Sequence, residues 1–372
     1  MKITNIEVIP VGEKLDEPLW WGAFGISIRG AVLIRISTDE GITGWGEAGY
    51  AYKFAKRIKD VIEEIKSEII GEDPLYIERI WNKVYNPTHL WGKRGINTYA
   101  LSGIDIALWD IKGKVAGLPI FKLLGGDKNI IKAYSAPSLK EPSVFKKECE
   151  KIMEQGFKAI KVRLGIDPKT DLELVRIARE TIGDNVELMV DGNMAYDFKT
   201  AIKMAKELEK YNILWFEEPI KVHTQEQYIN EYTKFNPLIS MKLAGGEQFF
   251  TRYEFQGLLA NKAVDIVQPD CTGVGGITEG KKIADMASVY GIYCVPCVAC
   301  SSIATIGLAA NLHLVGSISN TMYIEYDAYE SNIRKEMAIE PIYAENGFVK
   351  IPDGPGLGLE INEKMIEKYT LA

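Results

Sequence analysis

The feature that most constrains the fold of this chain is a polar residue that returns at the end of one short apolar stretch after another. From residue 130 onward, eight such stretches alternate with amphipathic helical segments. The polar residues recur at intervals of roughly 23–30 residues, about the length of one βα unit. This spacing predicts a parallel (β/α)8 barrel of the TIM type, in which one residue per unit reaches a common mouth at the carboxyl ends of the strands. The residues concerned are Lys161, Arg163, Asp191, Glu217, Glu247, Asp270, Cys297 and Glu325.

The barrel is predicted to occupy residues 126–345, between two other parts. Residues 1–125 begin with β-type alternation and a turn at Asp39–Gly41, then take a helical spacing that stops at Gly117. Strands followed by helices indicate an α+β domain. Residues 346–372 are rich in glycine and proline, and we expect them to pack back on this first domain.

Composition narrows the class of protein. The chain has a net charge of −7, with charges of both signs interspersed, which argues against a nucleic-acid partner. Its first residues hold no apolar run long enough for a signal peptide, and no stretch approaches the ~20 apolar residues of a membrane span. Five cysteines, three of them crowded between residues 294 and 300, do not suit a disulfide framework. We therefore expect a cytoplasmic protein with no membrane partner.

Asp191, Glu217 and Glu247 are candidates for a metal site. Three carboxylates that converge in a partly dry mouth repel one another and take up protons unless a cation compensates them. Ligation by oxygen alone suits Mg²⁺ or Mn²⁺ and leaves positions for water and substrate oxygens. The alternative is that these are separate acids, each capping the helix that follows its strand.

Lys161 and Arg163 lie two residues apart, so both side chains point to the same side of a strand. They are either ion-paired structural residues or a base and a clamp for an anionic substrate. Neighbouring cations would lower the pKa of Lys161 and favour its neutral form. Arg163 stays protonated at ordinary pH, which makes it a poor base and a good clamp for a carboxylate or a hydroxyl.

Seven motifs spread along the chain form a recognisable set. They are "GITGWGEA" (41–48), "ALSGIDIALWDIKGKVAGLPIFKLLGG" (100–126), "KVR" (161–163), "VDGN" (190–193), "WFEEP" (215–219), "AGGEQF" (244–249) and "VQPDCTGVGGITEG" (267–280). Together they resemble the enolase superfamily, in its mandelate racemase / muconate lactonizing enzyme branch. The resemblance covers nearly the whole chain and implies a homo-oligomer in which the N-terminal domain caps the barrel mouth.

The resemblance also implies a chemistry and assigns residues to it. Asp191, Glu217 and Glu247 would bind Mg²⁺, and the enzyme would remove the proton α to a carboxylate and stabilise the enediolate on the metal. Asn193 and Glu325 would contact the substrate. The segment "EPLWWGAFG" (17–25), with Trp20 and Trp21, is expected to form a loop that helps to choose it.

Two positions depart from the family pattern. The second strand has Lys161-Val-Arg163 where K-x-K is usual, so Lys161 becomes the better candidate for the base. Asp270 is present on the sixth strand, but Cys297 stands where many members have the histidine that pairs with it. We expect Cys297 to face the site as a neutral thiol and a weak proton donor, and Cys294 and Cys300 to be packing residues.

Other residues have weaker claims to a role. His223 follows "EEPI" and could replace the missing acid, whereas His313 is expected in the core and His89 in the capping domain. The glycines of "TGVGG" (272–276) lack a full dinucleotide fingerprint and are expected to form a βα turn.

The sequence thus favours a hydro-lyase that dehydrates a sugar acid, an aldonate or aldarate, to a 2-keto-3-deoxy acid. A dehydration tolerates the missing histidine better than a racemisation, which needs proton-transfer groups on both faces of the substrate. A cycloisomerase, epimerase or racemase of the same branch remains the in-class alternative. The alternative from another class is a non-catalytic protein that binds metal and sugar acid after losing its proton-transfer pair.

Overall fold

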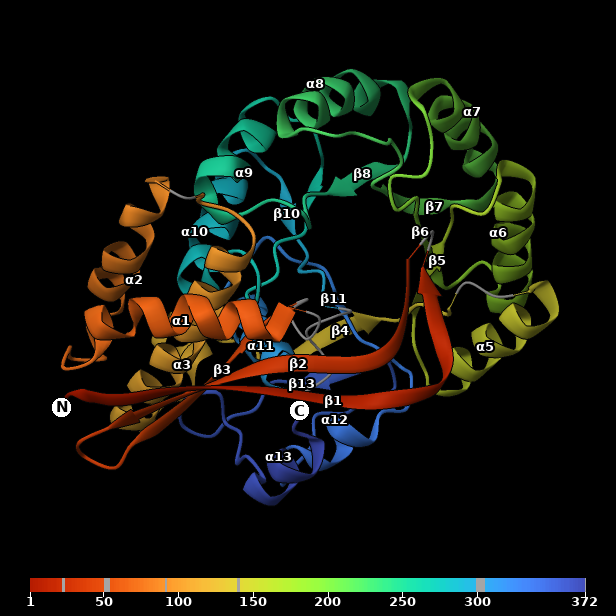
Figure 1. The fold of residues 1–372 in the computed structure, drawn as a ribbon. Coiled ribbons are helices and arrows are strands. Elements are labelled where there is room, and N and C mark those ends of the chain that lie inside the picture. Colours follow the sequence, from red (N-terminus) through yellow and green to blue (C-terminus); the bar gives the residue numbers. More distant parts are fainter. Residues whose placement is uncertain (22–23, 50–53, 91, 139–140, 299–304, 372) are drawn as a thin grey trace.

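The computed structural model describes residues 1–21, 24–49, 54–90, 92–138, 141–298 and 305–371. Figure 1 shows a ring of strands surrounded by helices, with the N-terminal elements beside it. The prediction of a (β/α)8-type barrel with an N-terminal α+β capping domain, completed by the C-terminal segment, is confirmed. No described helix is both long and apolar enough to cross a membrane.

The barrel consists of eight parallel strands, each followed by a helix. The strands are β4 (Ile130–Tyr134), β5 (Ala159–Arg163), β6 (Glu187–Asp191), β7 (Ile213–Glu217), β8 (Lys242–Gly245), β9 (Ile266–Val267), β10 (Tyr293–Cys294) and β11 (Ile324–Glu325). The helices are α5 (Pro142–Glu154), α6 (Pro168–Ile182), α7 (Phe198–Leu208), α8 (Gln225–Phe235), α9 (Thr251–Ala260), α10 (Gly276–Val289), α11 (Ile306–Gly316) and α12 (Asn332–Glu336). Two 3-10 turns, η3 (Glu209–Tyr211) and η4 (Asn236–Leu238), extend α7 and α8.

Hydrogen bonds between neighbouring strands carry the ring all the way round. Strands β5 to β10 form one parallel sheet in sequence order, and β4 pairs in parallel with β11. A parallel bridge between Ser135 and Ile160 links β4 to β5. On the other side, Cys294 of β10 donates its N–H to the carbonyl of Asn320, 2.7 Å away and shortly before β11. The first and last strands, β4 and β11, are thus paired, whereas β10 is joined to the segment before β11 by this backbone hydrogen bond rather than by paired strands.

An apolar layer fills the lower interior of the barrel. It has one side chain from each strand or its immediate flank, and all eight are buried. Alternation along a strand places every second side chain on the barrel axis, so this layer fixes which later residues also point inward. The members are Tyr134, Ala159, Met189, Trp215, Ala244, Ile266, Val295 and Tyr323.

The capping domain is a three-stranded antiparallel sheet with helices on it. Its elements are β1 (Ile3–Trp21), β2 (Phe24–Thr38), β3 (Thr43–Ala48), α1 (Ala55–Ile69), α2 (Ile77–Tyr85), the 3-10 turn η2 (Asn86–Leu90), α3 (Ile96–Ala116) and α4 (Ile120–Leu123). Strand β3 lies so close to α3 that a Cβ on Gly46 would sit 1.9 Å from the carbonyl oxygen of Gly103. Gly46, the second glycine of "GWGEA", is thus required because a side chain there would collide with the backbone of α3.

The segment 17–25 is not the loop that the sequence suggested. β1 runs to Trp21, β2 starts at Phe24, and these two residues are paired across the hairpin. The strands therefore extend through most of this segment, as its aromatic residues favour. The side chains of Trp20 and Trp21 lie outside what the structure describes, so their proposed contact with substrate stays a prediction.

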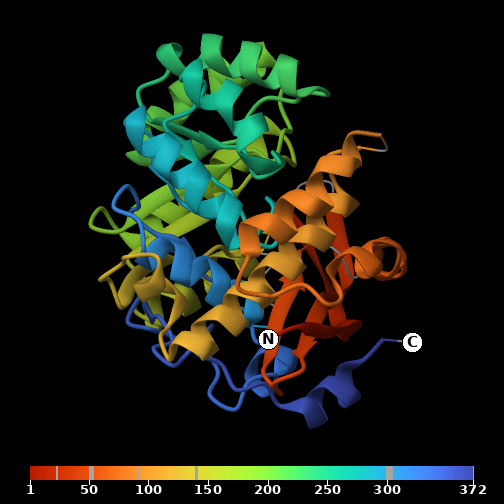
Figure 2. The same ribbon diagram turned by 90° about the vertical axis from the view of Figure 1, so that its left-hand side faces the viewer.

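The capping domain sits on the carboxyl ends of the barrel strands, on one side of the barrel (Figure 2). Its described contacts include the segments that follow strands β8, β9, β10 and β11, with Arg94 forming an ion pair with Glu254 after β8. Gly49 donates its N–H to Thr272, Glu47 accepts the N–H of Gly307, and Arg29 forms a buried ion pair with Asp327. The domain therefore covers part of the barrel mouth.

The "TGVGG" segment is the most heavily bonded of these contacts. It forms the turn between β9 and α10, as expected, rather than a nucleotide site. Trp81 donates to the Gly275 carbonyl over 2.8 Å, and the Gly275 N–H donates to Ser102 over 2.8 Å. The N–H of Thr278 donates to Asp105 over 3.0 Å. These glycines allow α2 and α3 to approach the barrel closely.

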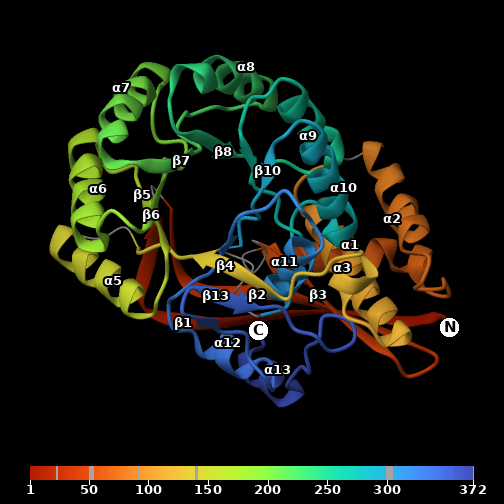
Figure 3. The same ribbon diagram turned by 180° about the vertical axis from the view of Figure 1, so that it is seen from behind.

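The C-terminal segment contacts both domains (Figure 3). It contains β12 (Ala344–Glu345), β13 (Phe348–Lys350) and α13 (Glu363–Tyr369). β13 pairs antiparallel with barrel strand β4. The last described residues reach β1, where Thr370 bridges Val11 and Leu371 donates to the carbonyl of Pro10. The C-terminal segment thus pairs with strands of both domains. The domain boundaries at residues 125 and 345 stay predictions.

We predict that Gly276→Ala destabilises the protein more than Gly71→Ala. Both glycines have φ near +90°, at +91° and +85°, a region that costs other residues roughly 1–3 kcal/mol. A Cβ on Gly276 would lie 2.0 Å from Asp105 Oδ1, whereas one on Gly71 would meet nothing within 4 Å. Urea unfolding should therefore show an extra loss of roughly 1–3 kcal/mol for Gly276→Ala. Equal losses would contradict the close packing of α3 on this turn.

A second prediction concerns pH. Burial raises the pKa of Asp105 from 3.8 to about 7, so the folded protein keeps a proton that the unfolded chain releases at lower pH. Stability is therefore lost as the pH rises from about 4 to about 7, by up to roughly 4 kcal/mol. Asp105→Asn cannot titrate, so its Tm should fall less than that of the wild type between about pH 5 and about pH 8. Parallel Tm profiles would show that Asp105 titrates normally.

Candidate active site

A second, polar layer lies above the apolar layer of the barrel. Side chains two positions beyond a member of the apolar layer face the same axis, and six of these are polar or contain a thiol. All six are buried. We call them, together with the half-buried Glu247, the mouth layer. Its members are Lys161, Asp191, Glu217, Glu247, Gln268, Cys297 and Glu325.

Lys161 is the cation at the centre of the mouth layer. Its Nζ lies 2.9 Å from Glu217 Oε1 and 3.5 Å from both Asp191 Oδ2 and Glu325 Oε1. Burial acts to lower the pKa of Lys161, but Glu217, Glu325 and other neighbours together raise it well above its usual value. The sequence suggested that neighbouring cations would lower the pKa of Lys161. The surrounding carboxylates raise it instead, because they outweigh Arg163.

The carboxyl groups of Asp191, Glu217 and Glu247 all have raised pKa values, so each keeps its proton to a higher pH than usual. Burial is the main cause that raises the pKa of each carboxyl group, and it brings that of Glu217 to about 7. Glu247 further raises the pKa of Asp191, Asp191 that of Glu217, and Glu217 that of Glu247. The three acids that the sequence grouped thus lie within electrostatic reach of one another, but the described ligand atoms that lie within 4.8 Å of one another come from Glu217, Glu247 and Cys297 and not from Asp191.

Asn193 fixes the orientation of Asp191. Its backbone N–H donates to Asp191 Oδ1 over 2.9 Å, and its Nδ2 donates to Oδ2 over 3.0 Å. Asn193 has a positive φ of 42°, which an asparagine tolerates and which turns the chain back toward β6. The "VDGN" motif therefore builds a carboxylate whose two oxygens are held in place.

Arg163 and Glu325 form the opposite wall. Arg163 donates to the Pro137 carbonyl over 3.3 Å, and its Nη2 lies 3.5 Å from Glu325 Oε1. Burial acts to raise the pKa of Glu325, but Lys161 and Arg163 outweigh it and lower that pKa. Glu325 is thus the carboxylate of this layer that keeps its charge most readily.

Cys297 faces the mouth, as the sequence suggested. Its Sγ lies 3.2 Å from Glu247 Oε2 and 3.4 Å from Glu325 Oε2. Burial and these two carboxylates raise the pKa of the thiol well above its usual value. It is therefore a protonated donor. Cys294, three residues earlier, lies in the core instead.

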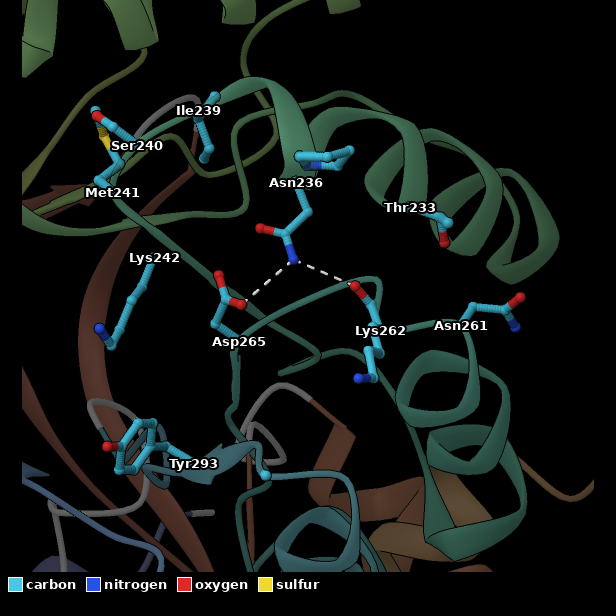
Figure 4. Close-up of a pocket in the computed structure, with 12 residues that line it drawn as sticks. Thr233, Asn236, Ile239, Ser240, Met241, Lys242, Asn261, Lys262, Asp265 and Tyr293 are labelled. Carbon is cyan, nitrogen blue, oxygen red and sulfur yellow. Dashed lines mark hydrogen bonds between the residues drawn. The ribbon is translucent and has the colours of Figure 1, made fainter.

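A hollow of about 690 Å³ lies at the other end of the barrel (Figure 4). Lys242 begins β8 there, Asp265 precedes β9 and Tyr293 begins β10, so this is the amino-terminal face. Asp265 accepts hydrogen bonds from Asn236 and from the N–H of Leu243. In this fold the amino-terminal face serves stability, and active sites lie at the opposite end of the barrel.

Comparison with known proteins places the chain in a family. Residues 144–365 match the profile described as enolase C-terminal domain-like, and residues 3–125 match the N-terminal domain of mandelate racemase / muconate lactonizing enzyme. The chain belongs to the mandelate racemase / muconate lactonizing enzyme family.

Relatives in this family are similar over almost their whole length. The arabinonate dehydratase of Saccharolobus solfataricus is 37% identical, over 91% of this chain and 90% of its own. The D-galactarolactone cycloisomerase of Agrobacterium fabrum is 35% identical, over 100% and 99%. The crystal structure of the 3,6-anhydro-D-galactonate cycloisomerase from Zobellia galactanivorans superposes with a TM-score of 0.90 at 34% identity, covering 100% of both chains.

Asp270 has no histidine partner at position 297, which is a cysteine in this chain. It accepts hydrogen bonds from other residues instead. Asp270 Oδ1 accepts the N–H of Thr272 and the Nδ2 of Asn311, each over 2.9 Å. Asn311 in turn donates to the Gly307 carbonyl and accepts the N–H of Cys271. Asp270 is therefore tied to α11 by an amide that carries no titratable proton.

The remaining candidates lie outside the mouth layer. His223 is exposed in the turn between β7 and α8, where its backbone N–H donates to Gln227. His313 is buried on α11 between the N–H of Phe121 and the carbonyl of Leu357, as expected for a core residue. Burial lowers its pKa to about 4, so it is neutral. His89 belongs to η2 in the capping domain.

Two residues of the site were missed from sequence. Asn311 lies in an apolar helix and carries no local signal. Gln268 could have been found, because it stands two residues after Ile266 and therefore faces the axis. Its side chain has no exposed surface and lies close enough to lower the pKa of Glu217, yet neither amide atom has a hydrogen bond of ordinary geometry.

We predict that Lys161→Met destabilises the protein most at high pH. Removing the cation leaves buried carboxylates unpaired, which typically costs about 3–5 kcal/mol. As the pH falls these groups take up protons and the loss should shrink. Denaturant unfolding at several pH values measures this, with Lys158→Met, an exposed lysine just before β5, as the matched control. A pH-independent loss equal to that of the control would contradict the central role of Lys161.

Proposed function

We propose that the protein is a Mg²⁺- or Mn²⁺-dependent hydro-lyase that dehydrates a sugar acid to a 2-keto-3-deoxy acid. The observation that carries the proposal is a buried lysine surrounded by carboxylates at the mouth of a barrel of this family. The dehydratase among the relatives supports the reaction class. The substrate class is a small hydroxylated carboxylic acid, an aldonate or aldarate.

The donor set fits a hard divalent cation. Asp191, Glu217 and Glu247 supply oxygens alone, and burial together with mutual repulsion raises the pKa of each. A compensating cation would let all three ionise, which is the setting that Mg²⁺ and Mn²⁺ prefer. Bound there, the metal would act as a Lewis acid on a substrate carboxylate.

Lys161 is the proposed base. The C–H bond at the α-carbon breaks and its proton passes to the Lys161 amine, the C–O bond at the β-carbon breaks, and the hydroxyl leaves as water after taking up a proton. Either the Lys161 ammonium formed in the first step or the Cys297 thiol supplies that proton. Lys161 can act only while the neighbouring acid charges are compensated, since those charges raise its pKa.

Other residues hold the substrate in this proposal. Arg163 is half-buried beside Glu325 and orients a carboxylate or a hydroxyl of the substrate. Asn193 and Glu325 bind hydroxyls, and Trp20 and Trp21 of the cap hairpin contribute to substrate choice. Asp270 is proposed to tune neighbouring charges, and its Oδ1 accepts hydrogen bonds from Asn311 and Thr272. His223 is a further candidate for a substrate contact, although its side chain is exposed in the turn after β7.

Cycloisomerisation is the second candidate. Two cycloisomerases match the full length of this chain, whereas the dehydratase matches 91% of it. Both reactions begin by removing an α-proton, so both need Lys161. They differ in the substrate, which is an acid with a free β-hydroxyl in one case and a lactone or anhydro ring in the other.

The setting proposed for this enzyme is the cytoplasm, as a homo-oligomer. Cys149, Cys271, Cys294 and Cys297 are free and buried thiols, which suits a reducing compartment. The oligomer rests on the family resemblance.

The test is turnover in D₂O with Mg²⁺ and a panel of aldonates, aldarates and their lactones. We expect loss of the α-proton and release of a 2-keto-3-deoxy acid from at least one acid, with deuterium at C3, where the enol left by the elimination takes up a solvent deuteron as it becomes the ketone. Lys161→Met should lower both signals by at least roughly 100-fold, as loss of a general base does, while Lys158→Met should leave them unchanged. Ring opening without dehydration would favour the cycloisomerase. Binding with neither signal would show a non-catalytic protein.

A further inference from the structure

Cys297 gives the mouth layer a second possible set of metal ligands. One ligand atom from each of Glu217, Glu247 and Cys297 lies within 4.8 Å of the other two. The closest of these approaches that the thiol makes is 3.2 Å, to Glu247 Oε2. Ligand atoms around a tetrahedral zinc, with metal–sulfur and metal–oxygen distances of roughly 2.3 and 2.1 Å, stand about this far apart. The three groups therefore need little movement to share one cation.

An independent observation at the same place points to a missing partner. Gln268 belongs to the same layer, has no exposed surface, and lies next to Glu217. It lies close enough to Glu217 to lower the pKa of that acid, yet neither its Oε1 nor its Nε2 has a hydrogen bond of ordinary geometry among the described residues. A buried amide without partners costs roughly 1–3 kcal/mol, so such groups usually meet a ligand, an ion or a water molecule. Gln268 Oε1 is the candidate for a neutral oxygen ligand.

We propose that Glu217, Glu247 and Cys297 bind a thiophilic divalent cation of the Zn²⁺ or Cd²⁺ class. This ligand set differs from the all-oxygen set by exchanging Asp191 for a sulfur. Zn²⁺ and Cd²⁺ accept thiolate together with carboxylate, whereas Mg²⁺ requires oxygen. The proposal goes beyond the dehydration and does not depend on it.

The binding step balances as a proton exchange. A sulfur–metal bond forms, the Cys297 S–H bond breaks, and the proton leaves to solvent. Glu325 loses the hydrogen bond from the thiol but keeps Lys161 and Arg163 as partners. No electron is transferred.

The two ligand sets exclude each other, because they share Glu217 and Glu247. A thiophilic ion in the second set therefore prevents a hard cation from using the first. One consequence rests on the proposed function: where the protein has that metal-dependent activity, Zn²⁺ or Cd²⁺ bound through Cys297 would inhibit it.

The experiment uses the full-length, metal-free protein without substrate. Cd²⁺ and Co²⁺ are titrated in, and the sulfur-to-metal charge-transfer absorption is measured. The wild type should develop the band at one equivalent. Cys297→Ser should abolish it and weaken Cd²⁺ binding by at least roughly 100-fold, and Glu247→Gln should weaken it by at least roughly tenfold. Cys294→Ala, a core cysteine, and Asp191→Asn, outside the ligand set, should keep the band.

Each result decides the proposal. No band in the wild type, or a band that persists in Cys297→Ser, overturns it. Should Cys297→Ser fail to fold by circular dichroism, Glu247→Gln takes its place, and unchanged affinity in that variant overturns the proposal equally. A Cd²⁺ band in a protein that forms no 2-keto-3-deoxy acid rejects only the dehydratase, whereas formation of that product without a band rejects only the thiophilic site.

Discussion

The charge balance around Lys161 is the interaction on which the barrel mouth depends. A buried ammonium is unfavourable by itself, and so are the buried carboxylates around it, but their attraction compensates part of both costs. Among the described residues the balance is incomplete, since one lysine and one arginine face four acids: Asp191, Glu217, Glu247 and Glu325. The surplus negative charge explains both the proton retention of the acids and the affinity for a divalent cation that we propose.

The second constraint is the close contact between the capping domain and the β9–α10 turn. Glycines at 275 and 276 allow Ser102 and Asp105 of α3 to bond the backbone of the turn directly. The same turn follows Asp270, whose carboxylate is held by Asn311 of α11. Packing at the domain interface thus determines where a mouth residue sits, and a change in the cap can alter the site without touching it.

The sequence predicted the fold and most of the mouth layer for one physical reason. A period of one βα unit, combined with alternation along each strand, is enough to place Asp191, Glu217 and Cys297 on a common axis. This sequence pattern could not predict contacts between residues that are far apart in the chain, or properties that depend on several such contacts. Asn311 bonds Asp270 from forty-one residues away, and the raised pKa of Lys161 follows from the sum of several carboxylates rather than from its own motif. The extension of β1 to Trp21 and of β2 back to Phe24 was missed because a segment with proline and glycine, such as 17–25, is typical of a loop.

The pairing of Thr370 with Val11 has a consequence for how the molecule is made. The first strand leaves the ribosome well before Thr370, its neighbour at this edge, because the whole barrel lies between them in the sequence. The capping domain therefore waits, with an unfinished edge, until the barrel has been synthesised.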